Sequence, residues 1–544
     1  MRLSRRRSAA AVAVVVVALA AARVNAQNSS QFRDWKTSVL SGGGDGKPAV
    51  ACASLVSLTG YEFSVLSATA IPASADTPEY CRVSGLIQPE IRFDLSLPTT
   101  WNGRLYMFGN GGYAGEALDS TGRVATARRA VARGFAAVQT NTGHDAIAEP
   151  LGSFAASPQK FVDYAARAVH VTVMTAKRVL QSYYNLAPRR SYWDGCSTGG
   201  RQGLIEAQRF PDDFDGILAG APVLDFSGTM ISYSMMQRVL GAASVAPAKL
   251  KLVADAAYAK CDAADGLKDG VIDDPRTCRF SPSADLKHCA GDADGADCFT
   301  SAQLHAIESV YAPVRRGGGD FFPGWPPGAE IAAVPSGQSG WVPWFVAATG
   351  RPIQAGFGET FFRFMAFGAP KPTYDWLSFN LDADLDTIDA ARTLLDATNP
   401  DLSRFKARGG KMLTYFGWAD PALNPMMGVR YYESVLRQIG PTTADFYRLF
   451  MVPGMFHCGG GIGTSTFDAF TPLVEWVEKG TLPHTIAASR IVDGKVVRTR
   501  PLCPYPQVAK YKGSGSIDEA ASFACSAADA RSSAGAGRAP ASRP

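Results

Sequence analysis

A serine with a glycine two residues before it and another two residues after it is the first candidate for chemistry. The stretch YWDGCSTGGRQG places Ser197 between Gly195 and Gly199. This spacing is typical of a tight strand-to-helix turn, where larger residues at the glycine positions would collide with neighbouring backbone. Such a turn lifts the serine hydroxyl above the sheet, where it can act as a nucleophile. The alternative is a plain glycine turn with a surface serine.

A serine nucleophile needs a histidine as its base. The chain has six histidines. His457 lies in a glycine-rich loop, PGMFHCGGG, directly after the apolar stretch FYRLFMV, which suits a base. His484 lacks such a loop, and His170 lies inside a predicted helix, where a structural role is the simpler interpretation.

The histidine in turn needs a carboxylate that orients it. Asp420 directly follows the apolar stretch MLTYFGWA, whereas Asp401 and Asp445 follow no clear strand end. The chain order Ser197, Asp420, His457 is that of an α/β-hydrolase.

The tetrahedral intermediate of acyl transfer also needs N–H groups that bind its oxyanion. A glycine-rich loop, GNGG, follows the predicted strand RLYMF. We expect the N–H of Gly112 in this loop and the N–H of Thr198, the residue after the candidate nucleophile, to form this oxyanion hole.

The elements around these residues alternate between strand and helix. The stretch IRFDLSLP alternates apolar and polar residues as a strand does, and residues 158–184 carry apolar residues at helical spacing. This alternation of strands and helices predicts a mostly parallel sheet covered by helices. The alternation ends at about Leu224 and resumes with the predicted strand in GGKMLTYFGWADP. The predicted organisation is a hydrolase domain in two parts, 27–223 and 392–526, with an inserted domain at 224–391.

The first residues predict export. Residues 1–26 combine arginines, an apolar run and a V-N-A cleavage site, which is typical of a signal peptide. Five of the 54 Lys and Arg residues lie in this segment and none of the 49 Asp and Glu residues does, so the remaining chain has 49 of each. This balance gives no support for binding to nucleic acid or to a membrane. We expect a secreted or periplasmic monomer with a disordered tail at 527–544.

The chain has ten cysteines and no C-x-x-C pair. An even number in an exported chain favours disulfides over free thiols or zinc ligands. The sequence alone does not fix the pairing, but closeness suggests four pairs, which leaves Cys196 and Cys458 for each other. A bond between these two would hold Ser197 near His457. The four suggested pairs are Cys52–Cys81, Cys261–Cys278, Cys289–Cys298 and Cys503–Cys525.

An acidic stretch, CDAADGLKDGVIDDP, has the composition of a calcium loop. Carboxylates alternate with glycines, which gives hard oxygen ligands on a backbone that can fold tightly. The alternative is a solvated acidic turn. The candidate ligands are the carboxylates of Asp262, Asp265 and Asp269 and the carbonyls of Leu267 and Val271.

The motifs GCSTGGRQ, GWADP and PGMFHCGGG resemble those of the tannase and feruloyl esterase family of α/β-hydrolases. The resemblance covers nearly the whole mature chain. It implies that the inserted domain is a lid over the serine, and that CDAADGLKDGVI is the calcium loop of this lid. The C-terminal stretch resembles the branch that includes the mono(2-hydroxyethyl) terephthalate hydrolase, whose disulfide pattern the five pairs fit.

The resemblance also implies that the lid shapes a pocket for an aromatic acyl group. The candidate ring contacts are Trp341, Trp344, Phe345 and Phe357, with the lid core as the alternative place for them. Terephthalate-ester hydrolases grip the free carboxylate of the substrate with a lid arginine. Here Ile353 takes that place, with Arg351 and Arg363 nearby.

The resulting hypothesis is a secreted serine esterase for feruloyl, galloyl or related aromatic esters, without an organic cofactor. One alternative is a hydrolase of mono(2-hydroxyethyl) terephthalate. Another serine hydrolase class, such as a peptidase, is a further alternative, as is a catalytically inactive homologue that binds polyphenols or carbohydrates.

Overall fold

The structure is a computed structural model that describes residues 46–330 and 340–527. The predicted signal peptide at 1–26 and residues 528–544 of the predicted tail at 527–544 lie outside the described residues. Ala527, which was predicted as the first residue of the disordered tail, is instead the last residue of a strand.

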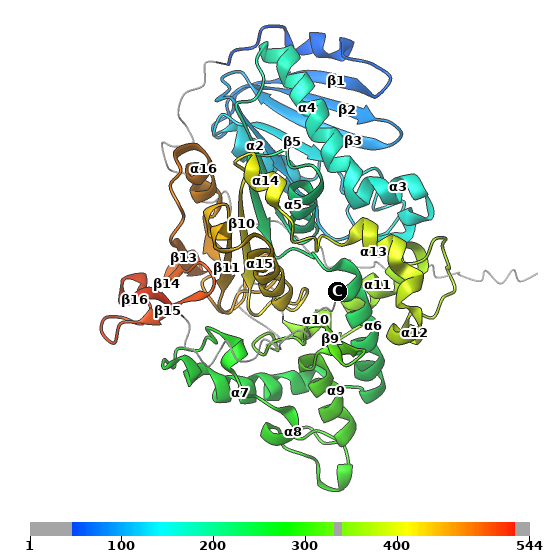
Figure 1. The fold of residues 1–544 in the computed structure, drawn as a ribbon, viewed down its shortest axis with the longest axis vertical. Coiled ribbons are helices and arrows are strands. Elements are labelled where there is room, and N and C mark those ends of the chain that lie inside the picture. Colours follow the sequence, from blue (N-terminus) through cyan, green and yellow to red (C-terminus); the bar gives the residue numbers. More distant parts are fainter. Residues whose placement is uncertain (1–45, 331–339, 528–544) are drawn as a thin grey trace, which may run out of the picture.

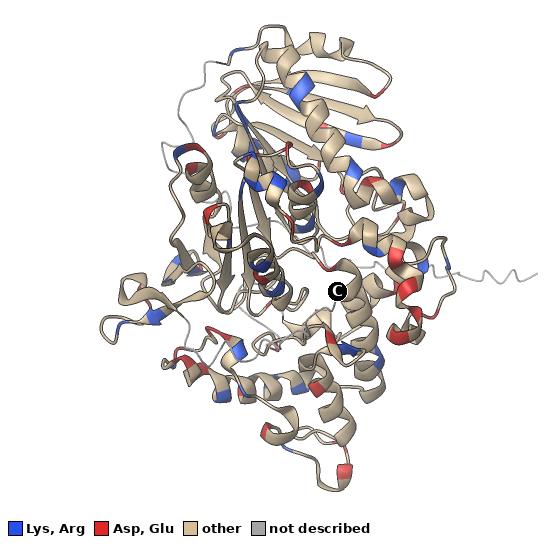
Figure 2. Ribbon diagram, viewed as in Figure 1, with Lys and Arg blue, Asp and Glu red and all other residues tan. Residues whose placement is uncertain are grey.

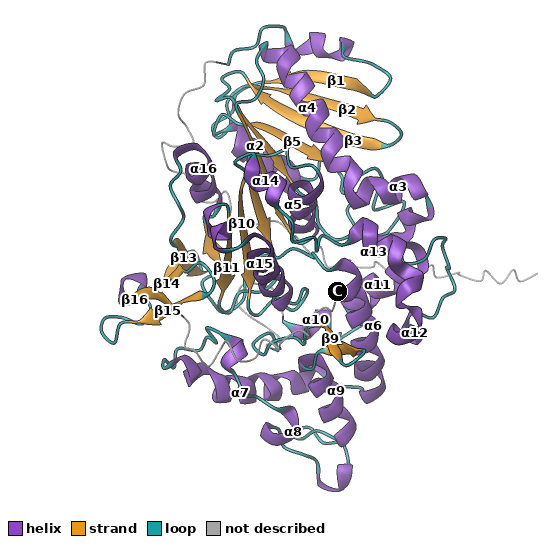
Figure 3. Ribbon diagram, viewed as in Figure 1, coloured by secondary structure: helices purple, strands orange, loops and turns teal. Residues whose placement is uncertain are grey.

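A nine-stranded sheet forms the centre of the molecule (Figures 1 and 3). Its strand order is β1-β2-β3-β5-β4-β6-β7-β10-β11. The first three strands pair antiparallel, and β3 is antiparallel to β5, whereas the strands from β5 to β11 in this order are all parallel. This confirms the predicted mostly parallel sheet. The strands are β1 (Phe63–Ile71), β2 (Tyr80–Ile87), β3 (Ile91–Pro98), β4 (Arg104–Phe108), β5 (Ala136–Thr140), β6 (Arg190–Cys196), β7 (Gly216–Gly220), β10 (Lys411–Gly417) and β11 (Tyr447–Val452).

Helices cover both faces of this sheet. Successive residues of a strand point to opposite faces. Gly216 of β7 faces α16, because a Cβ atom added to this glycine would lie 3.1 Å from the side chain of Val477. The next residue, Ile217, faces α5, because its side chain lies 3.0 Å from the position that a Cβ atom added to Gly203 would take. Therefore α16 and α5 pack on opposite faces (Figure 1). The helices outside the insertion are α2 (Thr121–Val131), α3 (Pro158–Val162), α4 (Ala168–Tyr184), α5 (Thr198–Arg209), α15 (Met426–Ile439) and α16 (Phe470–Lys479).

The helix predicted at residues 158–184 forms with one irregularity. A π-helical turn at Asp163–Arg167 separates α3 from α4. The buried Arg201 of α5 donates hydrogen bonds to the carbonyls of Tyr164 and Ala165 in this turn, at 3.2 and 2.9 Å. These hydrogen bonds thus connect the π-helical turn to α5, the helix that begins beside Ser197.

Between β7 and β10 the described chain adds no strand to the central sheet. This inserted segment is mostly helical and lies below the carboxyl ends of the parallel strands in Figures 1 and 3. Its limits at 224–391 remain a prediction. Its elements are α6 (Phe226–Ala243), α7 (Leu250–Cys261), α8 (Pro282–Asp285), α9 (Ser301–Tyr311), β8 (Val314–Arg316), β9 (Gly319–Phe322), α10 (Trp341–Trp344), α11 (Ile353–Thr360), α12 (Leu381–Asp384) and α13 (Asp389–Leu395). The next helix, α14 (Ser403–Ala407), lies beside α5 (Figure 1).

Two small sheets follow the last parallel strand. They are β12 (Thr466–Phe467) with β13 (Ile486–Val492) and β14 (Lys495–Leu502), and β15 (Gln507–Tyr511) with β16 (Phe523–Ala527).

Basic and acidic residues are interspersed over most of the ribbon, and acidic residues gather around α12 and α13 (Figure 2). Among the described residues, none of the helices has the length and hydropathy needed to span a membrane.

Candidate active site

Ser197 stands at the sharp turn between β6 and α5, as the glycine spacing predicts. Its φ of 63° and ψ of −120° are rare for a residue with a side chain. A Cβ on Gly195 would lie 2.6 Å from the carbonyl carbon of Gly199, and a Cβ on Gly109 would lie 2.6 Å from the Cα of Gly199. Glycine at these positions therefore lets the start of α5 pack directly against two strand ends, which fixes the serine above the sheet.

His457 and Asp420 meet above the ends of β10 and β11. The Nδ1 atom of His457 lies 2.8 Å from Oδ2 of Asp420. The other carboxylate oxygen of Asp420 accepts the N–H groups of Ala422 and Leu423 at 2.8 and 2.9 Å. Both side chains are buried. The two backbone N–H groups thus fix the carboxylate of Asp420, and the carboxylate in turn fixes the orientation of the imidazole. Because Nδ1 of His457 is occupied by this hydrogen bond, Nε2 is the nitrogen that can transfer a proton.

The structure forms the five disulfides in the pairs that the sequence suggested. The bond between Cys196 and Cys458 has an S–S distance of 2.08 Å and a Cα–Cα distance of 6.0 Å. It joins the residue before Ser197 to the residue after His457, so two loops that are 262 residues apart are linked beside the site.

The loop after β4 carries the candidate oxyanion hole. The carbonyl of Gly112 accepts hydrogen bonds from the hydroxyls of Thr198 and Tyr164. Upstream in this loop, the N–H of Gly111 donates to Glu116 at 3.1 Å. Within the described part of the chain, the N–H groups of Gly112 and Thr198 have no hydrogen-bond acceptor. Both residues border the same pocket as Ser197, so these two N–H groups are available to a ligand there.

Ser197 and His457 line one pocket at the junction of the sheet and the inserted segment. The ring of Trp344 lies 5.8 Å from the imidazole of His457, edge to face, and the rings of Tyr113 and Phe357 lie 4.9 Å apart. The wall is therefore mainly aromatic and aliphatic, as a pocket for an aromatic group requires. The lining residues are Gly112, Tyr113, Ser197, Thr198, Val223, Phe226, Met230, Tyr233, Trp344, Phe357, Ala422, Leu423 and His457.

Two of the four aromatic residues expected to touch a substrate do not line this pocket. Trp341 and Phe345 are buried and pack on each other at 5.2 Å between ring centroids. Phe345 also packs on Trp325 at 5.4 Å. These two rings form the interior of the inserted segment, which was the alternative place for them. Trp344 and Phe357 do line the pocket.

Neither arginine considered for carboxylate recognition lines the pocket. Arg351 and Arg363 both form ion pairs with Glu359, at 2.6 and 2.8 Å. Ile353 begins α11, one turn before Phe357. Among the described lining residues there is no lysine or arginine.

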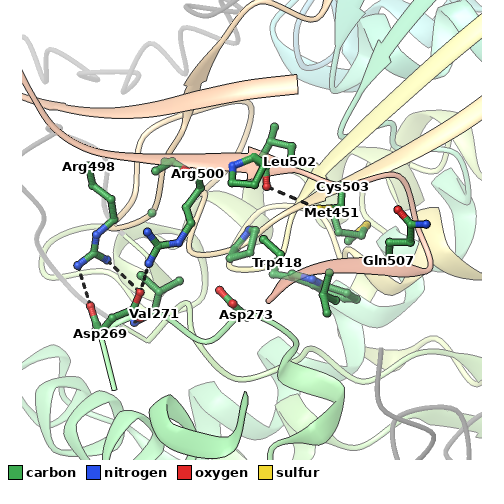
Figure 4. Close-up of a pocket in the computed structure, with 16 residues that line it drawn as sticks. Asp269, Val271, Asp273, Trp418, Met451, Arg498, Arg500, Leu502, Cys503 and Gln507 are labelled. Atoms are coloured by element: carbon green, nitrogen blue, oxygen red, sulfur yellow. Dashed lines mark hydrogen bonds and ion pairs between the residues drawn. The ribbon is translucent and has the colours of Figure 1, made fainter. Parts of the chain in front are cut away.

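The acidic stretch expected to bind calcium packs against β14 (Figure 4). The Oδ1 atom of Asp262 accepts the N–H groups of Asp269 and Gly270 at 3.1 and 2.9 Å. Arg498 and Arg500 of β14 pair with the carboxylate of Asp269. This salt bridge ties the acidic stretch to the C-terminal part of the chain.

A second pair of carboxyl groups in this stretch, Asp265 and Asp273, is unfavourable in its ionised form. Burial, with the nearby charges of Asp269 and Asp262, raises the pKa of Asp265 to about 6. Burial and the charges of Asp265 and Asp269 also raise the pKa of Asp273, a residue that the sequence analysis did not single out. Acidic side chains on a tightly folded backbone supply the hard oxygen donors that calcium prefers. Asp262 already accepts two backbone N–H groups, and Asp269 already pairs with two arginines. A calcium ion would therefore bind carboxylates that also keep these partners.

The comparisons with known proteins agree with this arrangement. Residues 76–526 match the family model described as tannase and feruloyl esterase. The chain is 35% identical over 527 residues to the mono(2-hydroxyethyl) terephthalate hydrolase of Piscinibacter sakaiensis, with 85% of this chain and 87% of that protein covered. It is 31% identical over 494 residues to a probable feruloyl esterase B of Aspergillus clavatus, with 83% of this chain and 88% of that protein covered.

A solved structure shares the fold. The crystal structure of feruloyl esterase B from Aspergillus oryzae superposes with a TM-score of 0.76 at 27% identity, covering 88% of this chain and all of that chain. The α/β-hydrolase fold expected from the order of serine, aspartate and histidine is thereby confirmed. The family match covers the central sheet from β2 to β11 and the whole segment between β7 and β10. The chain therefore belongs to the tannase and feruloyl esterase family and is a carboxylic ester hydrolase.

Proposed function

We propose that the protein is an exported serine esterase that hydrolyses uncharged esters of aromatic acids. One observation carries this proposal. Ser197 and His457 border a single apolar pocket, and the imidazole of His457 is oriented by a hydrogen bond of 2.8 Å to the buried Asp420. A nucleophile, a base and an orienting acid around an aromatic-lined cavity support acyl transfer from an aromatic ester.

The reaction proceeds through an acyl-enzyme. The hydroxyl of Ser197 attacks the ester carbonyl while Nε2 of His457 takes its proton, and Asp420 stabilises the imidazolium through Nδ1. The N–H groups of Gly112 and Thr198 bind the oxyanion. His457 then gives the proton to the leaving alcohol, and a water molecule activated by the same imidazole releases the acid. Removal of one oxyanion donor of this kind costs about 3–4 kcal/mol.

The pocket wall favours an uncharged acyl group over terephthalate monoesters. The described lining residues include no lysine or arginine, and burial of an unpaired carboxylate is costly. Residues 331–339, IAAVPSGQS, contain no lysine or arginine in their sequence. The terephthalate monoester remains the alternative substrate, because the chain is similar to the mono(2-hydroxyethyl) terephthalate hydrolase of Piscinibacter sakaiensis.

A matched substrate pair tests this choice. The ester 2-hydroxyethyl benzoate differs from mono(2-hydroxyethyl) terephthalate only by the para carboxylate. We expect kcat/KM to be at least tenfold higher for the benzoate, with methyl ferulate also hydrolysed, and no turnover of any of the three by Ser197→Ala. A preference for the terephthalate monoester would instead establish the alternative substrate. Turnover by Ser197→Ala that equals the wild-type rate would refute the serine mechanism.

We also propose export and a structural calcium ion. Five disulfides in one chain support an oxidising compartment. The carboxyl groups of Asp262, Asp265, Asp269 and Asp273, which alternate with glycines in one short stretch, support a cation there. Removal of calcium with EGTA should lower Tm, and added calcium but not magnesium should restore it. An unchanged Tm in EGTA would argue against the ion.

A further inference from the structure

Three titratable side chains gather where α4 packs on α5, outside the Ser197 pocket. His170 lies on α4, Glu206 on α5, and Asp213 in the loop between α5 and β7. One ligand atom from each of the three lies within 4.8 Å of the other two. None of them lines the pocket that contains Ser197 and His457. We call this group the His170 cluster.

Glu206 is the unusual member of the His170 cluster. Its side chain is 1% exposed, and both carboxylate oxygens are buried without a hydrogen-bond donor among the described residues. The neighbouring Asp213 is also buried, and a second carboxylate has no proton to donate in its ionised form. Such an arrangement calls for a positive partner, which is either a shared proton or a cation.

His170 gives the His170 cluster a nitrogen ligand and a route to solvent. Its Nδ1 lies 2.6 Å from Oδ2 of Asp213, and the ring stacks on Phe210 with 4.1 Å between centroids. The stacking fixes the plane of the imidazole. The His170 side chain is 34% exposed, whereas Asp213 is 4% exposed, so an ion can reach the buried carboxylates past the imidazole.

One cation already lies near the His170 cluster. Lys177 of α4 donates to the main-chain carbonyl of Asp213 at 2.8 Å. It does not donate to the carboxylate of Asp213 or of Glu206, so those oxygens remain available.

We propose that the His170 cluster binds one divalent metal ion of the zinc type, with an imidazole and two carboxylates as ligands. One nitrogen and two oxygen donors suit Zn²⁺ better than calcium, which prefers oxygen alone. Ligand atoms around a tetrahedral Zn²⁺ lie about 3.4 Å apart. The atoms of the His170 cluster, within 4.8 Å of one another, reach this spacing by small side-chain rotations. A water molecule would take the fourth position.

The ion would have a structural role. It would clamp α4, α5 and the loop that leads into β7, and α5 is the helix that begins at Ser197. The site is separate from the acidic stretch at residues 262–273, so the two ions would bind independently.

The test is zinc binding by the full-length protein after removal of bound metal, in buffer that contains calcium. We expect isothermal titration to show one Zn²⁺ site, a Tm rise of a few degrees in Zn²⁺, and an anomalous zinc peak between α4 and α5 in crystals. Substituted Co²⁺ should give visible absorption bands of a tetrahedral N/O site. Absence of the zinc peak at the His170 cluster would overturn the proposal.

The variant Glu206→Gln separates a metal from a shared proton. A glutamine can still donate a hydrogen bond to Asp213, so the fold should be retained, but one metal ligand is lost. We expect its affinity for Zn²⁺ to fall at least tenfold and its Co²⁺ bands to vanish. The matched control is His288→Gln, because His288 pairs with Asp292 at 3.1 Å on an exposed surface without a second buried carboxylate. If Glu206→Gln binds Zn²⁺ like the wild type, or if His288→Gln loses the same ion, the assignment is wrong.

Discussion

Cys196 and Cys458 join the residue before Ser197 to the residue after His457, with their Cα atoms 6.0 Å apart. Ser197 and Cys458 both have a φ of 63°, so each side of the bond lies in a tight and sterically restricted turn. The bond bypasses the whole inserted segment. The bond therefore holds the proposed nucleophile near the proposed base without the help of that segment.

Removal of this bond should affect the reaction more than the fold. For the double variant Cys196→Ser/Cys458→Ser we expect kcat to fall at least tenfold and Tm to fall by several degrees, since closure of a very long loop contributes about 2–5 kcal/mol. Circular dichroism should still show the native sheet and helix content. The control is Cys289→Ser/Cys298→Ser, which opens a short loop of the inserted segment. Equal losses of kcat in both variants would argue against a positioning role.

We expect the Asp420 carboxylate to contribute to kcat and to have little effect on the binding of substrate. For Asp420→Asn we expect kcat to fall by about 10³–10⁴ with KM nearly unchanged, because the amide favours the wrong imidazole tautomer. The matched control is Asp401→Asn, since Asp401 was the competing carboxylate in the sequence and is exposed in the structure. The assignment fails if the Asp401 variant loses more activity than the Asp420 variant.

A cation placed at Ile353 should change the substrate preference. Ile353 and the pocket residue Phe357 are one helical turn apart and lie on the same face of α11. In Ile353→Arg the guanidinium can pair with the para carboxylate of a terephthalate monoester. We expect kcat/KM for that ester to rise about tenfold, with little change for 2-hydroxyethyl benzoate. Ile353→Met controls for side-chain length, and an equal gain in this variant would exclude the ion pair as the cause.

Asp225 should make the stability of the fold depend on pH. It lies where the inserted segment begins, beside Asp396 where that segment returns. Burial first, and then the charge of Asp396, raise the pKa of Asp225 from 3.8 to about 7. Between these values the folded state binds more protons than the unfolded state, so the free energy of unfolding decreases as pH rises from about 4 to 7.

The variant Asp225→Asn should remove this dependence. Its amide oxygen can still accept the N–H of Gly228, as Asp225 does at 3.0 Å. We expect the variant to gain on the order of 1 kcal/mol over the wild type at pH 8, and little at pH 4, in urea unfolding. The exposed Asp255→Asn is the control for loss of a surface carboxylate. A wild-type pH profile in Asp225→Asn would contradict the expectation.

The sequence predicted those parts of the site that have a local signal. The glycines around Ser197 are required by the turn itself, and Asp420 and His457 each follow an apolar strand end, so all three could be named without knowledge of the fold. The two halves of the sheet could also be predicted from their alternating strands and helices. The five disulfides followed from closeness in sequence and one remaining pair.

The pocket wall could not be predicted in the same way. Tyr113 and Phe357 come from segments more than 200 residues apart, and their ring contact exists only after the inserted segment folds over the sheet. In the stretch GWVPWF a turn of irregular helix directs Trp344 to the pocket and Trp341 to the interior. No periodic pattern distinguishes those two rings. The same holds for the His170 cluster, since His170 by itself resembles any structural histidine on a helix.

The most direct measurement is the site of covalent labelling by a fluorophosphonate, which reacts only with an activated serine. After digestion, mass spectrometry should find one adduct per chain on the peptide that contains Ser197, and the labelling rate should fall at least a hundredfold in His457→Ala. An adduct on another serine, or wild-type labelling of Ser197 without His457, would contradict the account.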